Sequence, residues 1–328
     1  MVELIDAETT NLISYFLEIS SPFVMLVITL FILWGLQIII TQRAYLKYIF
    51  PEIRKHKITY WAIGWVAIAS HEILGHMIVG ASTGARIEDV VVTPTGGHVT
   101  STQEVSLLGQ FSLIMQSFAP CFSPPIFMVL LFYLLFPNNL LLPDQFTSIL
   151  DTNIQNVITI ASTITNLWNP YSWIFIYALI VTSLTAGAST EDVRVAVVRS
   201  IERPLVPVFL FIILLALTLI FANLGYDALP FLFWLITLSF AMVMLGIVIA
   251  TFIAFYLKNT ESLDLSRKII AFLSYAITYL AISYSNYPYH MAFGISIFIG
   301  TLILLILRLT SPRVQRTRIV FMADKGTS

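Results

Sequence analysis

Charged residues are scarce in this sequence of 328 residues, because Asp, Glu, Lys and Arg together account for only 11% of it. Soluble globular domains carry about 25% charged residues, so the composition argues against an ordinary soluble domain. Hydrophobic residues make up 58% of the chain, which is typical of a membrane protein. The formal net charge of -1 argues against a nucleic-acid partner, since such a partner requires a basic surface.

Cysteine is almost absent, and basic residues are missing from the start of the chain. The single cysteine, Cys121, excludes an intrachain disulfide and a metal site built from several cysteines. The first 21 residues contain four acidic residues and no Lys or Arg, whereas a secretory signal begins with a basic segment. We therefore expect the first apolar segment to be retained as a membrane span.

Apolar segments that are long enough to cross a bilayer recur along the chain. A spanning helix needs about 20 apolar residues. A further apolar segment, 105–136, contains Pro120, Pro124 and Pro125, and we expect either one long broken helix or the two arms of a re-entrant hairpin. The predicted fold class is an all-α polytopic membrane protein with about 7–8 transmembrane helices. The predicted spans are 22–41, 58–80, 169–188, 205–224, 230–257, 269–285 and 290–309.

Lys and Arg mark the cytoplasmic side of membrane proteins. They cluster at 43–57, 194–203, 258–268 and 308–325. This pattern predicts a multi-pass protein of the cell membrane with a cytoplasmic C-terminus. An even number of crossings is needed between the first two clusters, so we expect either that 105–136 returns to the side from which it enters or that one of the basic clusters does not mark the cytoplasmic side.

One segment between the spans has the composition of strands. Residues 81–103 contain a β-branched run, Val90 to Val92, followed by Pro94 and Gly96-Gly97. Such a pattern predicts a strand, a turn and a second short strand. We therefore expect a small β-hairpin directly after the span 58–80.

The span 58–80 contains His71, Glu72 and His76. A charged group at the centre of a membrane helix costs about 2.5–3.5 kcal/mol, so such groups persist where they meet a metal, water or each other. The usual zinc signature is H-E-x-x-H, but here one more residue separates the histidines. At about 100° per residue, a regular α-helix would turn the two imidazoles about 140° apart. A π-bulge aligns residues i and i+5, so we hypothesise a π-turn across 71–76, eased by Gly75.

These residue types favour a catalytic zinc site with one Zn²⁺ ion. His71 and His76 would supply two nitrogen ligands, and a third protein ligand and an open position for water would complete the site. Glu72 would accept the proton of that water and pass it to the leaving amine. The alternative interpretation is that both histidines are polar groups satisfied inside a helix bundle.

Three segments in order resemble the site-2 protease family of intramembrane zinc metalloproteases, particularly its divergent multi-span branches. They are HEILGHMIVGASTGARIEDVVVTPTGGHV, GQFSLIMQSFAP and AGASTEDVRVA, within about 58–200. The resemblance implies that the third segment delivers an acidic ligand, which we assign to Asp192. The alternatives are Glu191 and His98. Ser189 to Asp192 also fits a helix capping motif, which is a purely structural explanation of the same residues.

The resemblance also implies hydrolysis of peptide bonds in membrane-embedded or membrane-proximal protein segments. A membrane helix satisfies its own backbone, so a substrate would be unwound locally and could add as a strand to the hairpin. A structural plug over the metal is the alternative role of the hairpin. The candidate substrate-binding residues are Val91, Val92, Gly96 and Gly97.

Two other functions compete with the protease. The unusual histidine spacing is compatible with a catalytically inactive, zinc-binding scaffold. A metal transporter is less favoured, because transporters spread ionisable residues over several spans. The expected domains are 1–57, an N-terminal span and basic loop; 58–203, a metalloprotease-like membrane core; 204–310, an accessory bundle; and 311–328, a cytoplasmic tail.

Overall fold

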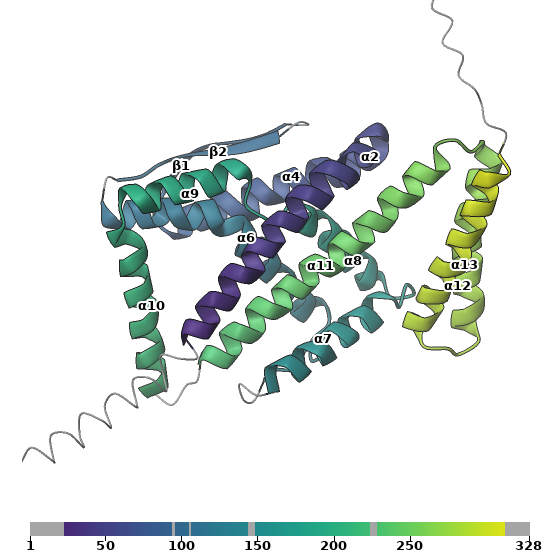
Figure 1. Ribbon diagram of the computed structural model, residues 1–328. Helices are drawn as coiled ribbons and strands as arrows, with labels where there is room; N and C mark the ends of the chain where they lie inside the picture. Colours follow the sequence, from purple (N-terminus) through teal and green to yellow (C-terminus); the bar gives the residue numbers. More distant parts are fainter. Residues whose placement is uncertain (1–22, 94–95, 105, 144–147, 224–227, 312–328) are drawn as a thin grey trace, which may run out of the picture. The chain divides into compact units, whose positions relative to one another are not determined.

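The structure is a computed structural model, and it describes residues 23–93, 96–104, 106–143, 148–223 and 228–311. These residues are mostly helical and include one two-stranded sheet (Figure 1). The chain divides into two compact units, Met1–Ala254 and Phe255–Ser328. Each unit is described by itself.

The described residues contain six helices that are long and apolar enough to cross a membrane. The six helices are compatible with the predicted helical membrane protein, although they are fewer than the about 7–8 spans expected. The predicted span 169–188 corresponds to α8 (Pro170–Leu184), whose 15 residues extend only about 22 Å, less than the thickness of a bilayer core of about 30 Å. The predicted span 205–224 corresponds to α10 (Leu205–Asn223). The six helices are Phe23–Lys55, Lys57–Ser82, Leu107–Leu135, Leu229–Thr260, Leu265–Tyr284 and Tyr289–Leu309.

The first two candidate spans combine α-helical and π-helical turns without interruption. The first runs from an α-helix over 23–40 through η1 (Thr41–Ile49), a π-helix, into α2 (Phe50–Lys55). The residues that join consecutive pieces within each span keep right-handed helical dihedrals, so each span remains one helix. The second consists of α3 (Lys57–Thr59), η2 (Tyr60–Gly64), α4 (Trp65–Ser70), η3 (His71–Met77) and α5 (Ile78–Ser82).

The proline-containing segment forms one continuous helix, α6 (Leu107–Leu135). Its N-cap is Ser106, whose Oγ accepts a hydrogen bond of 3.1 Å from the backbone N–H of Gly109. The re-entrant alternative for 105–136 is wrong, because the helix runs through Pro120, Pro124 and Pro125. A single helix has no turn at which the chain reverses, so the expected return to the side of entry is wrong as well.

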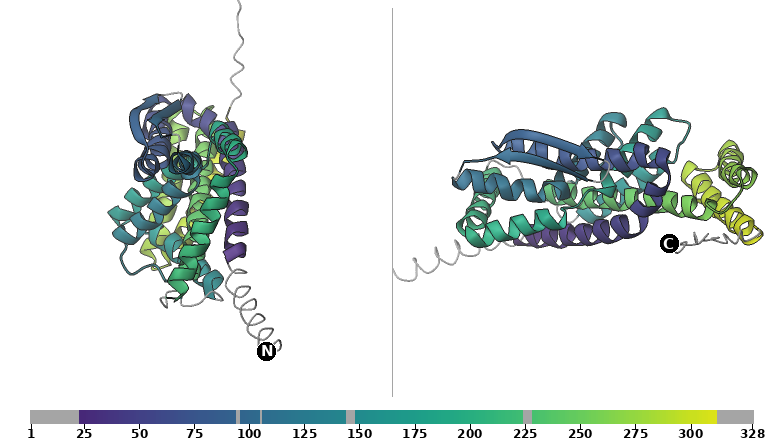
Figure 2. Two further views of the ribbon diagram at one scale, coloured as in Figure 1. Left: turned by 90° about the vertical axis from the view of Figure 1, so that its left-hand side faces the viewer. Right: turned by 90° about the horizontal axis from the view of Figure 1, so that it is seen from above.

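The predicted β-hairpin is confirmed. Strands β1 (Arg86–Thr93) and β2 (Gly96–Thr102) are antiparallel, and Val91 lies opposite His98. The hairpin contacts α4 and η3 and runs alongside that span (Figures 1 and 2). It therefore covers the helix that carries the two histidines.

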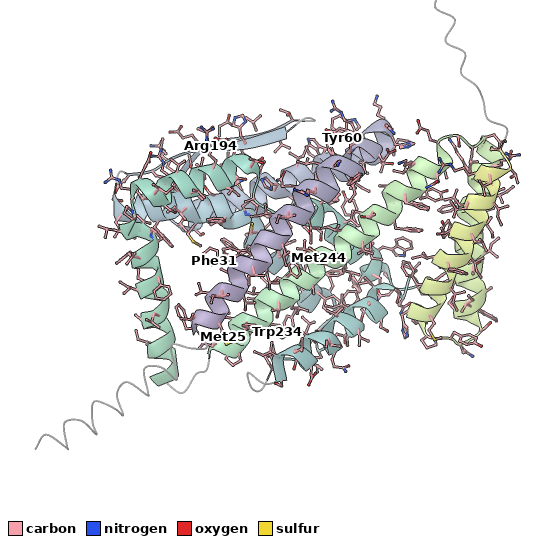
Figure 3. All side chains as sticks on the ribbon, in the orientation of Figure 1. Met25, Phe31, Tyr60, Arg194, Trp234 and Met244 are labelled. Carbon is pink, nitrogen blue, oxygen red and sulfur yellow. The ribbon has the colours of Figure 1, made fainter. Side chains whose placement is uncertain are left out.

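Helices from distant parts of the first unit surround the π-helix η3. Helix α6 packs against both η3 and α9 (Thr190–Glu202), and α8 packs against α4. One apolar core joins η1, α2, α8 and α11 (Ala228–Thr260), and a second joins α6, α7 (Ile149–Ile164), α8 and α11. Figure 3 labels Met25 and Phe31 on the helix over 23–40, and Trp234 and Met244 on α11. The beginning of the helix over 23–40 packs against the beginning of α11.

The second unit is built on two helices joined by a short loop, α12 (Leu265–Tyr284) and α13 (Tyr289–Leu309). A partly buried polar contact joins its ends, in which Nη1 of Arg308 donates to Oδ1 of the buried Asn259. The hydroxyls of Tyr275 and Thr301 share a further hydrogen bond of 3.1 Å.

Candidate metal centre

The two histidines of the second span lie on the same side of a π-helical turn. The hypothesised π-turn across 71–76 is confirmed, because η3 is a π-helix from His71 to Met77. The Nε2 atoms of His71 and His76 are 3.3 Å apart. Two nitrogens bound at about 2.05 Å to one tetrahedral ion are separated by about 3.3 Å. The two imidazoles are therefore spaced as ligands of a common metal ion.

Close packing of η3 on α6 accompanies the widened turn. A Cβ atom on Gly75 would lie 2.9 Å from Cγ of Pro120, so only glycine allows the two helices to approach this closely. The hydroxyl of Ser123 donates a hydrogen bond of 2.5 Å to the carbonyl oxygen of Leu74. Such a contact satisfies a backbone acceptor inside an irregular helix.

Asp192 approaches both imidazoles from α9. Its Oδ1 lies 3.5 Å from Nε2 of His76, and its Oδ2 lies 3.7 Å from Nε2 of His71. The ligand atoms of these three residues all lie within 4.8 Å of one another. Two imidazoles and one carboxylate are a donor set that zinc accepts, with a fourth position left for water.

Asp192 also forms the predicted capping box at the start of α9. The backbone N–H of Ser189 donates to Oδ2 of Asp192 at 2.7 Å, and the backbone N–H of Asp192 donates to Oγ of Ser189 at 3.1 Å. Burial raises the pKa of this carboxyl, whereas the neighbouring His71 and His76 and the hydrogen bonding with Ser189 lower it, and the net result is a pKa well below its usual range. The carboxyl is therefore ionised at neutral pH. The Asp192 side chain therefore both caps α9 and faces the two histidines.

Backbone carbonyls fix the orientation of both imidazole rings. Nδ1 of His76 donates to the carbonyl oxygen of Gln116 at 2.9 Å, and Nδ1 of His71 donates to that of Thr185 at 2.9 Å. A carbonyl only accepts, so the proton stays on Nδ1 and the lone pair of each Nε2 faces the common centre. Partners of this kind orient the ligands of metal sites and raise their basicity.

Both carbonyls lack a donor within their own helix, and that of Thr185 also accepts a hydrogen bond of 2.9 Å from the backbone N–H of Gly187. Proline has no backbone N–H, so Pro120 leaves the carbonyl of Gln116, four residues earlier, without its helical donor. Thr185 follows the last residue of α8, where carbonyls have no partner within the helix. The Thr185 hydroxyl also donates to the carbonyl oxygen of Ala67 at 2.8 Å, which fastens the end of α8 to α4.

A second proline-freed carbonyl supports the segment that leads to Asp192. Pro125 leaves the carbonyl of Cys121 without its helical donor, and Nε2 of Gln37 donates to it at 3.0 Å. The same Nε2 donates to the carbonyl oxygen of Ala186. The Cys121 sulfur accepts from the backbone N–H of Ala188 at 3.2 Å. Gln37 and Cys121 thereby hold 186–188 against α6.

Glu72 lies beside the three converging side chains and beneath the hairpin. Its side chain is buried, and a Cβ atom on Gly97 would lie 2.5 Å from its Cγ. Glycine is therefore required where β2 crosses Glu72. A cavity of about 520 Å³ has Glu72, His71, His76 and Asp192 in its wall, together with Gly97, His98, Val99, Thr100 and Ser101 of β2.

The structure separates the other two ligand candidates from the three converging residues. Glu191 is exposed and pairs with Arg194, whose Nη1 lies 3.5 Å from its Oε2. His98 is exposed on β2 and lines the same 520 Å³ cavity, but it is not part of the three-residue group. Val91 and Val92 lie on β1, opposite His98 and Gly97.

Sequence reasoning missed the residues that orient this site. Gln116, Thr185 and Ser123 act through backbone or hydroxyl groups that carry no sequence signature of their own. Two signals were present, since Pro120 stands four residues after Gln116 and Gln37 is a polar residue within an apolar segment. The chain matches no protein-family model, no curated protein and no solved structure.

Proposed function

We propose that the protein is an intramembrane zinc metallopeptidase that hydrolyses peptide bonds in membrane-embedded protein segments. One observation carries the proposal. The Nε2 atoms of His71 and His76, 3.3 Å apart, converge with the Asp192 carboxylate on one point beside Glu72. Three protein ligands of these types, with room for a water molecule, are the composition of catalytic zinc sites.

The fit of the donor set to zinc rests on orientation as well as distance. Each imidazole keeps its proton on Nδ1 through a backbone carbonyl, so both Nε2 lone pairs are available to a cation. The Asp192 carboxylate offsets part of the charge of a divalent ion. Among the described residues, this is the one group of three His, Cys, Asp or Glu side chains that could hold a metal, whereas a transporter needs several such sites along its path.

Zinc, when bound, polarises the substrate carbonyl and brings the pKa of a bound water near neutrality. Glu72 supplies the proton transfer, because its carboxylate lies in the cavity wall next to both imidazoles. It accepts a proton from the attacking water as the oxygen adds to the carbonyl carbon. It then delivers that proton to the amide nitrogen as the C–N bond breaks.

The hairpin provides a surface for an unwound substrate. Residues 97–101 of β2 line the 520 Å³ cavity together with Glu72, and the sheet has only two strands in the described residues. An extended segment that pairs with the outer edge of β2 would pass over the site. Val91, Val92, Gly96 and Gly97 then act by shaping the hairpin, with Gly97 setting its distance from Glu72.

The Glu72→Gln variant tests the proposal. Full-length protein purified in detergent is expected to contain one zinc ion per chain and to cleave labelled single-span membrane proteins offered as probes. Glu72→Gln is expected to retain the zinc and to lose cleavage. Stoichiometric zinc without cleavage by either protein would instead support the non-catalytic scaffold, and purified protein without zinc would overturn the proposal.

A further inference from the structure

A second cavity adjoins the candidate metal centre on the side away from His76 and Asp192. It has a volume of about 420 Å³, and it shares five lining residues with the 520 Å³ cavity: His71, Glu72, Gly97, Ser189 and Glu191. The two cavities therefore meet where Glu72 lies beneath the hairpin and at the start of α9. A substrate that crosses this point would place residues on its two sides in two different environments.

The 420 Å³ cavity has an apolar wall contributed by four elements. We call it the apolar cavity. Its apolar side chains come from η1, α2 and α4 of the first two candidate spans and from α8, which follows much later in the sequence. A volume of this size holds a large side chain, since small-molecule sites span about 300–1,000 Å³. These residues are Tyr45, Leu46, Phe50, Ile68 and Leu184.

The polar side chains in the same wall are largely engaged with the protein itself. The hydroxyl of Thr41 donates to the carbonyl oxygen of Gln37 at 2.8 Å, and that of Thr185 donates to Ala67. Nε2 of Gln42 donates to the carbonyl oxygen of Ala188 at 3.3 Å. Further polar groups in this wall include the exposed Glu191 carboxylate, which is paired with Arg194, and the Tyr45 hydroxyl, which has no hydrogen-bond partner among the residues that the structure describes. The side chains of Leu46, Phe50, Ile68 and Leu184 give the wall its hydrocarbon surface.

The 520 Å³ cavity has a different character, and we call it the polar cavity. Its wall contains the apolar side chains of Val99, Leu113 and Val195, but it also contains more polar side chains than the wall of the apolar cavity, including His98, Thr100, Ser101, Gln116 and Ser117. Ser101, Gln116 and Ser117 donate hydrogen bonds within the protein, whereas His98 and Thr100 are exposed on β2 and can meet hydrogen-bonding groups of a substrate. The two sides of the site therefore differ in the substrate side chains that they accept.

From this asymmetry we infer that the apolar cavity is a specificity subsite for a large apolar side chain of the substrate. The subsite takes a residue such as Phe or Leu on one side of the scissile bond, while the polar cavity takes polar or small residues on the other. This inference rests on the proposed function, because it assumes that a peptide crosses the metal centre.

Metal-binding hydroxamates test the subsite without requiring cleavage. Two series of peptide hydroxamates place a single Phe, Leu, Ala or Asp side chain on either side of the zinc-binding group. Their affinities for the zinc-loaded, full-length protein in detergent are measured by calorimetry. One series is expected to bind with Phe or Leu about tenfold or more tighter than with Ala or Asp, and the other series is expected to show no such preference.

Leu46→Ser and Leu36→Ser form a matched pair of variants. Both leucines are on the first candidate span and about half exposed, at 51% and 44%, but only Leu46 lines the apolar cavity. Leu46→Ser is expected to reduce the apolar preference about threefold or more, while Leu36→Ser leaves it unchanged.

The outcomes separate this inference from the proposed function. Hydroxamate binding without side-chain preference, or an equal effect of the two variants, would overturn the subsite and leave the zinc peptidase standing. Absence of hydroxamate binding from a protein that contains zinc would overturn both. Preference in one series, lost in Leu46→Ser, would support the subsite even in a protein that cleaves no offered probe.

Discussion

The carbonyl oxygen of Gln116 accepts a hydrogen bond of 2.9 Å from Nδ1 of His76, and it is free to do so because Pro120 has no backbone N–H to offer it. A hydrogen bond missing from one continuous helix, α6, thereby orients a candidate ligand in another. The proline that interrupts the hydrogen-bond ladder of α6 has a defined role in the site.

Replacement of Pro120 by alanine restores the missing N–H and makes it compete with His76 for the Gln116 carbonyl. We expect Pro120→Ala to weaken zinc affinity by about 10–100-fold, the usual effect of removing a hydrogen-bond partner of a metal ligand. Competition with a chelating dye measures it. Pro124→Ala is the control, because that change returns an N–H to the carbonyl of Pro120 instead. Equal zinc affinity in the two variants would contradict the role given to Pro120.

Asp192 both caps α9 and faces the imidazoles, and two variants separate these roles. Ser189→Ala removes the hydroxyl that accepts from the Asp192 N–H and is expected to cost about 1 kcal/mol of stability while zinc is retained. Asp192→Ala is expected to lose the zinc as well. Metal analysis and thermal unfolding of both proteins provide the comparison. Full zinc content in Asp192→Ala would show that Asp192 caps α9 but does not bind the metal.

Gly97 sets the distance between the hairpin and Glu72. A methyl group at Gly97 would lie 2.5 Å from Cγ of Glu72, whereas a methyl group at Gly96 would meet nothing within 4 Å. Overpacking of this kind costs about 1–3 kcal/mol, so Gly97→Ala is expected to lower kcat about tenfold or more without loss of zinc. Gly96→Ala is the matched control. Similar kcat values for the two variants would show that the hairpin does not constrain Glu72.

Gln37 is 2% exposed and links α6 to the segment before Asp192. Gln37→Leu replaces the amide by an apolar side chain of similar size and leaves two buried carbonyls unpaired, at a cost of about 1–3 kcal/mol. We expect a lower melting temperature and weaker zinc binding, measured by thermal unfolding with and without a chelator. Leu36→Ala, at an exposed neighbour, controls for changes to the same helix. A loss of stability with unchanged zinc affinity would show that Gln37 stabilises the fold but does not position the metal ligands.

The local features of the site could be predicted from the sequence, but their partners could not. The spacing of His71 and His76 predicted a π-turn because a regular helix cannot align residues five apart. Gly96-Gly97 and the β-branched run predicted the hairpin. These predictions depend on neighbouring residues, whose geometry the sequence encodes directly.

The remaining features depend on packing between distant segments. The prolines of 105–136 predicted a break, yet α6 continues through them, because neighbouring side chains satisfy two of the carbonyls that the prolines free. The approach of Asp192 to the histidines was expected from a family resemblance, and its distance from them follows from the packing of α9 on α6. The contact of Thr185 with His71 had no sequence signal, since any residue supplies a carbonyl.

Zinc K-edge X-ray absorption of the purified protein tests the common metal centre most directly. The account predicts one zinc ion per chain with two imidazole nitrogens and carboxylate or water oxygens at about 2.0–2.2 Å, and one imidazole fewer in His76→Ala. A sulfur neighbour, a single imidazole in the unaltered protein, or the absence of stoichiometric zinc would contradict it.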